Sequence, residues 1–138
     1  MNIKDEQAML AVGMALAAQL KPGMLIFLNG DLGAGKTTLV RGILRGLGRS
    51  GAVKSPTYNI VEPYEINGTA VFHFDLYRLH DPEELEYMGV RDYINDNAIC
   101  FIEWPDRGEG LLPAADLQIH IKIHQNERDI QIIPVIDL

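Results

Sequence analysis

Apolar residues recur along the chain with two periods, one typical of helices and one typical of strands. Near the N-terminus, Asp5 can cap a helix that ends at the stop signal Lys21-Pro22-Gly23. The apolar side of this helix has four residues at helical spacing: Leu10, Met14, Ala17 and Leu20. A second helix is predicted over residues 36–47, with apolar residues at Leu39, Ile43 and Leu47.

Strands are predicted from three other patterns. Residues 24–28 and 98–102 are short, continuous apolar runs of the kind that buried parallel strands show. Residues 59–66 and 69–75 flank Asn67-Gly68, and Asn-Gly between two such runs is the strongest short hairpin signal. A half-exposed strand and its partner are predicted from alternating residues at 117–123, a turn at 125–128 and a run at 129–133.

The remaining segment predicts two short helical pieces. Asp81-Pro82-Glu83-Glu84 is typical of a helix start, and this helix should end near Gly89. A further helical turn is predicted over residues 92–94. At 138 residues with 47% hydrophobic content, the chain fits one domain, residues 1–138. The predicted fold class is α/β, with a mixed sheet that is parallel at its centre, antiparallel at the hairpins and flanked by helices.

A glycine-rich segment joins the first apolar run to the second helix. It has the pattern Gly-x-x-x-x-Gly-Lys-Thr of a phosphate-binding loop (P-loop) and reads Gly30-Asp31-Leu32-Gly33-Ala34-Gly35-Lys36-Thr37. Glycines allow successive backbone N–H groups to converge on a phosphate oxygen, and the N-terminus of the next helix adds positive charge. Lys36 would contact the β- and γ-phosphates, and the hydroxyl of Thr37 would ligate Mg²⁺. The predicted architecture is therefore that of a P-loop NTPase.

Two predicted strands end in acidic residues. Glu103 ends an apolar strand, where a P-loop enzyme places the acid that holds Mg²⁺, usually through water. Asp75 could orient or deprotonate the attacking water. His73 lies two residues earlier on the same predicted strand and so points the same way, although an ordinary structural place is the alternative for it. No third His or Cys is spaced to complete a zinc site.

Further candidates lie in loops. Thr57 follows Pro56 after the second helix, where switch loops of nucleotide hydrolases carry a hydroxyl that senses the γ-phosphate and the metal. Trp104 is adjacent to Glu103, which places it near the nucleotide. Arg78 and Arg107 are candidate cationic stabilisers of the transition state, with an inert surface position as the alternative.

The net charge of −7 restricts the partners, because a broad nucleic-acid-binding face should be basic. Residues 32–61 nevertheless contain basic side chains and no acid, whereas acids prevail over residues 75–109. We interpret the basic segment as a solvated face beside the phosphate site; a docking surface for a partner protein is the alternative. No apolar run is long enough for a membrane span and the N-terminus carries acids, so a cytoplasmic protein is expected. Cys100, the single cysteine, is expected to be a buried thiol.

Five motifs, in order along nearly the whole chain, resemble those of the bacterial TsaE family, the ATPase component of tRNA threonylcarbamoyladenosine biosynthesis. They are Gly30-Asp31-Leu32-Gly33-Ala34-Gly35-Lys36-Thr37-Thr38, Lys54-Ser55-Pro56-Thr57-Tyr58, His73-Phe74-Asp75-Leu76-Tyr77-Arg78-Leu79, Asp81-Pro82-Glu83-Glu84-Leu85 and Phe101-Ile102-Glu103-Trp104-Pro105. The chain ends at Leu138, where relatives often continue into a short tail.

The resemblance implies Mg²⁺-dependent ATP hydrolysis, with ATP and ADP as ligands, in support of the TsaB–TsaD protein complex. That complex modifies the adenosine beside the anticodon of tRNAs that read codons beginning with A, so contact with tRNA would be indirect. Residues matching Gly30–Thr38 would bind the phosphates, and those matching Thr37 and Glu103 would hold Mg²⁺. The resemblance also implies that Lys36, Thr57, Asp75 and Trp104 are needed for activity. It further implies that Glu6 and Arg128 lie near the nucleotide base.

Two other functions are compatible with the glycine-rich loop when the loop is considered by itself. A small-molecule kinase uses the same loop, but kinases of this fold usually add an acceptor site and an arginine-rich lid, for which 138 residues leave little room. A nucleotide-dependent switch without appreciable turnover is the second rival. A GTPase is disfavoured because the chain has no Asn-Lys-x-Asp run for guanine.

Overall fold

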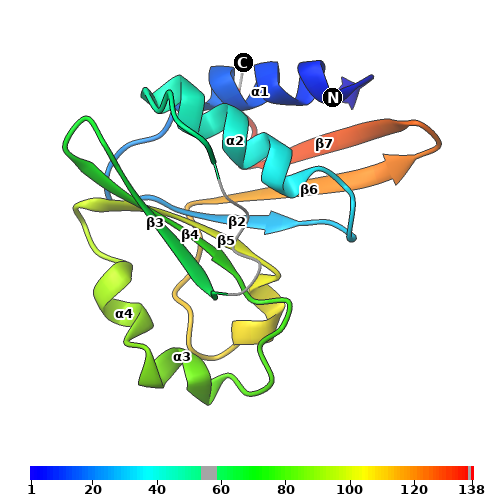
Figure 1. Ribbon diagram of the computed structural model, residues 1–138. Coiled ribbons are helices and arrows are strands. Elements are labelled where there is room, and N and C mark those ends of the chain that lie inside the picture. Colours follow the sequence, from blue (N-terminus) through cyan, green and yellow to red (C-terminus); the bar gives the residue numbers. More distant parts are fainter. Residues whose placement is uncertain (54–58, 137) are drawn as a thin grey trace.

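A mixed β-sheet separates two layers of helices (Figure 1). The computed structural model describes residues 1–53, 59–136 and 138. The strands of these residues are β1 (Asn2–Ile3), β2 (Leu25–Asn29), β3 (Val61–Ile66), β4 (Thr69–Asp75), β5 (Ala98–Glu103), β6 (Leu117–His124) and β7 (Glu127–Ile133). The helices are α1 (Glu6–Ala17), α2 (Lys36–Leu47), α3 (Glu83–Tyr87), α4 (Val90–Tyr93) and the 3-10 turn η1 (Pro105–Gly108).

The strand order across the described part of the sheet is β1-β7-β6-β2-β5-β4-β3. The pairs β6–β2, β2–β5 and β5–β4 are parallel, whereas β1–β7, β6–β7 and β3–β4 are antiparallel. The predicted fold class, an α/β domain with a parallel centre and antiparallel hairpins, is confirmed. Glu103 is in register with Leu28 on one side and with Asp75 on the other, so β2, β4 and β5 end together. Ligands of open α/β sheets bind at such carboxyl ends.

Each face of the sheet buries its own apolar cluster. Ile99 and Phe101 of β5 pack on the side of α1 and α2 with residues such as Leu16 and Leu39. Cys100 and Ile102 pack on the opposite side, the side of α3 and α4. Every residue of β5 is buried, which explains its continuous apolar run. The Cys100 thiol donates to the Tyr93 carbonyl at 3.3 Å, and burial raises its pKa to about 12, so it is the buried thiol that the sequence predicts.

Helix α1 packs on α2 at glycines, which bring the two backbones close together. Met14 is 51% exposed, so its predicted place on the buried face is wrong, and Leu10 is only partly buried. The buried residues of α1 are Met9, Gly13, Leu16 and Ala17. A Cβ at Gly13 would lie 2.5 Å from the Leu39 carbonyl oxygen, so the two backbones approach too closely there for any side chain. The predicted apolar side is therefore confirmed for Ala17 and Leu20, which are buried, and wrong for the Met14 side chain.

Replacing Gly42 by Ala is expected to lower the free energy of unfolding by about 1–3 kcal/mol. The added Cβ would lie 2.4 Å from the Leu10 carbonyl oxygen and 3.0 Å from the Leu10 Cα, and backbone atoms cannot rotate away. Urea unfolding measures the change. Gly51→Ala is the matched control, because its Cβ would meet only the flexible Arg49 side chain. Equal stability of the Gly42 variant and the control would contradict the close helix contact, since alanine is otherwise the better helix former.

The element boundaries follow the sequence with several corrections. Asp5 caps α1 by accepting from the Ala8 N–H at 2.8 Å, and Asn67 and Gly68 both have positive φ in the predicted hairpin turn. Strand β3 begins at Val61 rather than at residue 59, and β7 begins at Glu127 because the turn before it is shorter than predicted. Helix α4 covers 90–93 instead of 92–94. The short elements β1 and η1 carry too few residues to show a period and were not predicted. None of the helices in the described residues is long and apolar enough to cross a membrane.

Candidate functional site

The glycine-rich loop connects the end of β2 to the start of α2. Gly33 and Gly35 adopt φ values of 80° and 107°, a region in which a Cβ is disfavoured, so the loop needs glycine at both positions. Gly35 is also the N-cap residue of α2 and provides no side-chain cap. The first N–H groups of α2 are consequently free of a capping side chain and can bind an anion.

Lys36, the first residue of α2, is held inside the loop and is only 5% exposed. Its Nζ donates to the Gly30 carbonyl at 2.5 Å and lies 3.9 Å from the centroid of the Trp104 ring. Burial lowers the pKa of Lys36, and the negative charges of Glu103 and Asp75 act against this shift. The ammonium therefore stands beside the loop with partners that a phosphate can replace.

Glu103 lies beneath the loop at the end of β5 and is 3% exposed. Its Oε2 accepts from the Thr37 hydroxyl at 3.5 Å and contacts His73 Nε2 at 2.5 Å. The described residues contain no group of three or more His, Cys, Asp or Glu side chains able to hold a metal by themselves. Magnesium commonly takes one or two protein ligands and completes its shell with phosphate oxygens and water. The oxygen pair of Thr37 and Glu103 fits that requirement.

Asp75 ends β4 directly beside Glu103. Its Oδ1 accepts from the Tyr77 N–H at 3.0 Å. Burial is the main cause of a raised pKa at Asp75; the Tyr77 hydrogen bond acts in the opposite direction and the Glu103 charge adds to the rise. A carboxylate with a raised pKa next to a phosphate site is suited to accept a proton from water.

Trp104 follows Glu103 in the left-handed conformation, with φ 57° and ψ 52°. Such a conformation costs a non-glycine residue on the order of 1–3 kcal/mol and is found mainly at functional sites. The turn directs the indole ring over Lys36 Nζ at 3.9 Å and against the Tyr77 ring at 5.0 Å between centroids. Trp104 thus contacts the side chain of Lys36 at the end of the glycine-rich loop.

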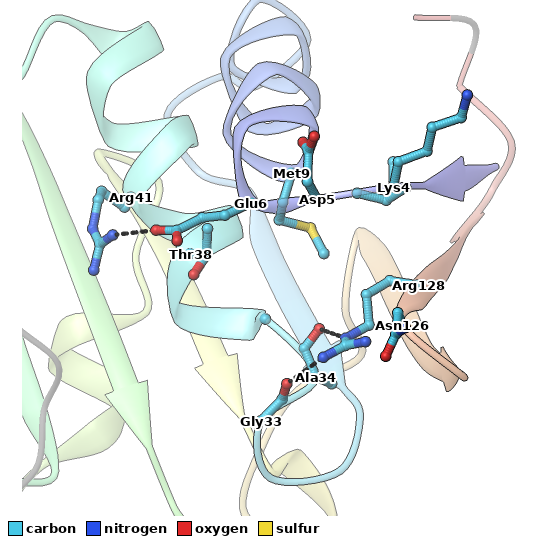
Figure 2. Close-up of a pocket in the computed structure, with 12 residues that line it drawn as sticks. Lys4, Asp5, Glu6, Met9, Gly33, Ala34, Thr38, Arg41, Asn126 and Arg128 are labelled. Carbon is cyan, nitrogen blue, oxygen red and sulfur yellow. Dashed lines mark hydrogen bonds and ion pairs between the residues drawn. The ribbon is translucent and has the colours of Figure 1, made fainter.

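A cavity of about 280 Å³ opens on the α1 side of the loop (Figure 2). Glu6 and Thr38 line it, and Glu6 pairs with Arg41 at 3.4 Å. Arg128 reaches in from β7 and donates to the carbonyls of Ala34 at 3.1 Å and Gly33 at 3.2 Å (Figure 2). Arg128 therefore fixes the backbone of the loop while it also borders the cavity.

The structure gathers most of the predicted residues in two adjacent places. Lys36, Thr37, Asp75, Glu103 and Trp104 lie at the carboxyl ends of β2, β4 and β5, and Glu6, Thr38 and Arg128 lie around the cavity. Asp31 and Leu32 are exposed at the tip of the loop. Thr57 lies outside the described residues.

Two contacts were not predicted. The contact of His73 with Glu103 joins residues 30 positions apart, and the only signal for it was that His73 shares a face with Asp75. The second contact is the ion pair of Arg41 with Glu6. Its only signal in the sequence is that Arg41 lies one helical turn beyond Thr37 and therefore on the same side of α2.

The glycine-rich loop, the uncapped start of α2 and the acid on the neighbouring parallel strand lie together at one end of the sheet of an α/β domain. Residues 3–130 match the family model "Threonylcarbamoyl adenosine biosynthesis protein TsaE". The chain belongs to the TsaE family.

Similar proteins support this assignment. The chain is 52% identical over 136 residues to the tRNA threonylcarbamoyladenosine biosynthesis protein TsaE of Haemophilus influenzae, covering 95% of this chain and 86% of that protein. It is 40% identical to the Bacillus subtilis protein of the same name, covering 87% of this chain and 75% of that protein. The crystal structure of Bacillus subtilis YdiB superimposes with a TM-score of 0.79 at 33% identity, covering 94% of this chain and 80% of that one.

Proposed function

We propose that this protein hydrolyses ATP with Mg²⁺ in the cytoplasm and thereby supports tRNA threonylcarbamoyladenosine biosynthesis by a TsaB–TsaD complex. One observation carries the proposal: Lys36 and the Thr37–Glu103 oxygen pair meet at the uncapped start of α2. Those groups supply the cation, the metal ligands and the backbone N–H donors that phosphoryl chemistry needs. The membership in the TsaE family supplies the pathway.

Each residue then has a distinct task. The N–H groups of the loop bind the phosphates of ATP, and Lys36 exchanges the Gly30 carbonyl and the Trp104 ring for phosphate oxygens. Thr37 and Glu103 would hold Mg²⁺, which neutralises developing charge on the phosphates. Asp75 orients the attacking water, and Thr57 is proposed to assist there. The cavity beside Glu6, Thr38 and Arg128 receives the nucleoside of ATP or ADP.

Hydrolysis is distinguished from the two rival functions by its products. Purified protein incubated with ATP and Mg²⁺ is expected to release inorganic phosphate without an added acceptor, and to stop when EDTA removes the metal. A small-molecule kinase would release phosphate only at the rate of a side reaction until its acceptor is supplied. A switch without turnover would bind ATP and release no phosphate even with TsaB and TsaD present.

Replacing Glu103 and Asp75 separately should give opposite patterns. Glu103→Gln removes the negative charge of one of the two proposed metal ligands, so Mg²⁺ should tighten nucleotide binding less and the rate should fall with it. Asp75→Asn keeps the size of a side chain that contacts Tyr77, so ATP affinity should persist while the rate falls by about 10²-fold or more. Titration of both variants with ATP and Mg²⁺ measures the two effects. The reverse pattern would mean that the two roles are exchanged.

A further inference from the structure

A buried histidine stands behind the proposed metal ligand. His73 is 0% exposed in the middle of β4, on the same face as Asp75. Among the described residues, the polar or charged side chains that are buried are those of Lys36, His73 and Glu103. All three belong to one cluster, because Lys36 interacts electrostatically with Glu103, and His73 contacts Glu103 directly. The polar and charged side chains that are buried in the described part of the chain therefore gather beside the glycine-rich loop.

The contact between His73 and Glu103 fixes the direction of the carboxylate. Nε2 of His73 lies 2.5 Å from Oε2 of Glu103, the same oxygen that faces the Thr37 hydroxyl at 3.5 Å. A carboxylate that binds Mg²⁺ is ionised and only accepts hydrogen bonds, so Nε2 of His73 is the donor when Glu103 acts as a metal ligand. The carboxylate of Glu103 is thus contacted by His73 of β4 and by Thr37 of α2 at the same oxygen.

The other ring nitrogen shows what the histidine contributes. Nδ1 of His73 is buried and has no hydrogen-bond partner among the described residues. A buried polar atom without a partner lowers stability, so an apolar side chain of similar volume would serve packing better. What the imidazole adds at this position is the donor to Glu103. Without that donor, a carboxylate that is 3% exposed would lose its closest compensating contact.

We propose that His73 is a positioning residue that holds the Glu103 carboxylate toward Thr37 and so sets the affinity of the site for Mg²⁺. The inference rests on the proposed function, because it assigns Glu103 to the metal. Groups that orient a metal ligand typically change metal affinity by about 10–100-fold when they are removed.

The test measures the dissociation constant of a fluorescent ADP analogue in Mg²⁺ and in EDTA, and takes the ratio of the two. His73→Phe should reduce the advantage that Mg²⁺ gives by about tenfold or more. His73→Gln can place an amide donor near the position of Nε2 and should keep most of the advantage. His73→Asn is too short to reach Glu103 and should behave like His73→Phe, which keeps the test valid if the larger variant does not fold.

Phe74→Leu is the matched control for packing. Phe74 is fully buried next to His73 but faces the opposite side of the sheet. This variant should lower the melting temperature and leave the Mg²⁺ advantage at the wild-type value. A purely structural histidine would give that same result, so an unchanged ratio in folded His73→Phe or His73→Asn overturns the inference. Loss of the advantage in His73→Gln as well would overturn its hydrogen-bond basis.

The two proposals fail in different ways. If the wild-type protein binds ADP more tightly in Mg²⁺ and the His73 variants keep that gain, only the positioning role is wrong. If the wild-type protein itself binds ADP equally in Mg²⁺ and in EDTA, the assignment of Glu103 to the metal is wrong, and the inference is overturned with it.

Discussion

Lys36→Ala is expected to reduce ATP hydrolysis by at least about 10²-fold and to leave the fold intact. In the structure the ammonium is buried against a carbonyl and an aromatic ring, and burial lowers its pKa. The buried positive charge of Lys36 therefore lowers the stability of the protein without nucleotide. It becomes favourable only when phosphate oxygens replace the carbonyl and the ring. Phosphate release measures the rate, and thermal unfolding checks the fold.

Two further substitutions separate the lost charge from other effects. Lys36→Met keeps most of the buried aliphatic stem beside Trp104, so it should be as inactive as Lys36→Ala without the cavity that alanine leaves. Lys21→Ala removes an exposed lysine just beyond α1 and should hydrolyse ATP at the wild-type rate. Hydrolysis by Lys36→Ala at the rate of the Lys21 variant would refute the assignment of the phosphate site.

The sequence predicts those parts of the site that depend on neighbouring residues. Lys36 and Thr37 follow from one continuous motif between a strand and a helix, and the structure has both elements at that place. Glu103 is predicted from the end of a continuous apolar run, because it is the charged residue with which the buried strand ends. Asn67-Gly68 likewise defines its hairpin by local backbone preference.

The parts that were missed depend on packing between distant segments. The contact between His73 and Glu103 requires the register of β4 against β5, which no local pattern specifies. Met14 was assigned to the wrong face because α1 approaches α2 through glycine, which carries no apolar signal. Arg128 holds carbonyls of the loop from a strand 94 positions away, and nothing near it in the sequence indicates that role.

Addition of the TsaB–TsaD complex is expected to raise the ATP hydrolysis rate by a large factor, up to about 10³–10⁵-fold if the partner supplies or positions a transition-state cation. Three arginines near the described part of the site already have partners, and Arg78, another candidate stabiliser, is exposed. Arg128 donates to the loop carbonyls, Arg41 pairs with Glu6, and Arg107 lies 5.5 Å over the Tyr77 ring. The isolated domain should therefore be a slow ATPase.

Transfer RNA alone should not replace the protein partner. The net charge of −7 and the pI of about 4.9 oppose binding to a phosphate backbone, which normally requires a broad basic face. Phosphate release is measured with no addition, with tRNA, with TsaB and TsaD, and with all of them, at one fixed salt concentration. Lys36→Ala in the presence of TsaB–TsaD is the control that assigns the stimulated rate to this chain. A full rate without partners would contradict activation by the complex, and so would an equal rate with tRNA alone. In both cases the protein would reach its rate without a cation from another protein.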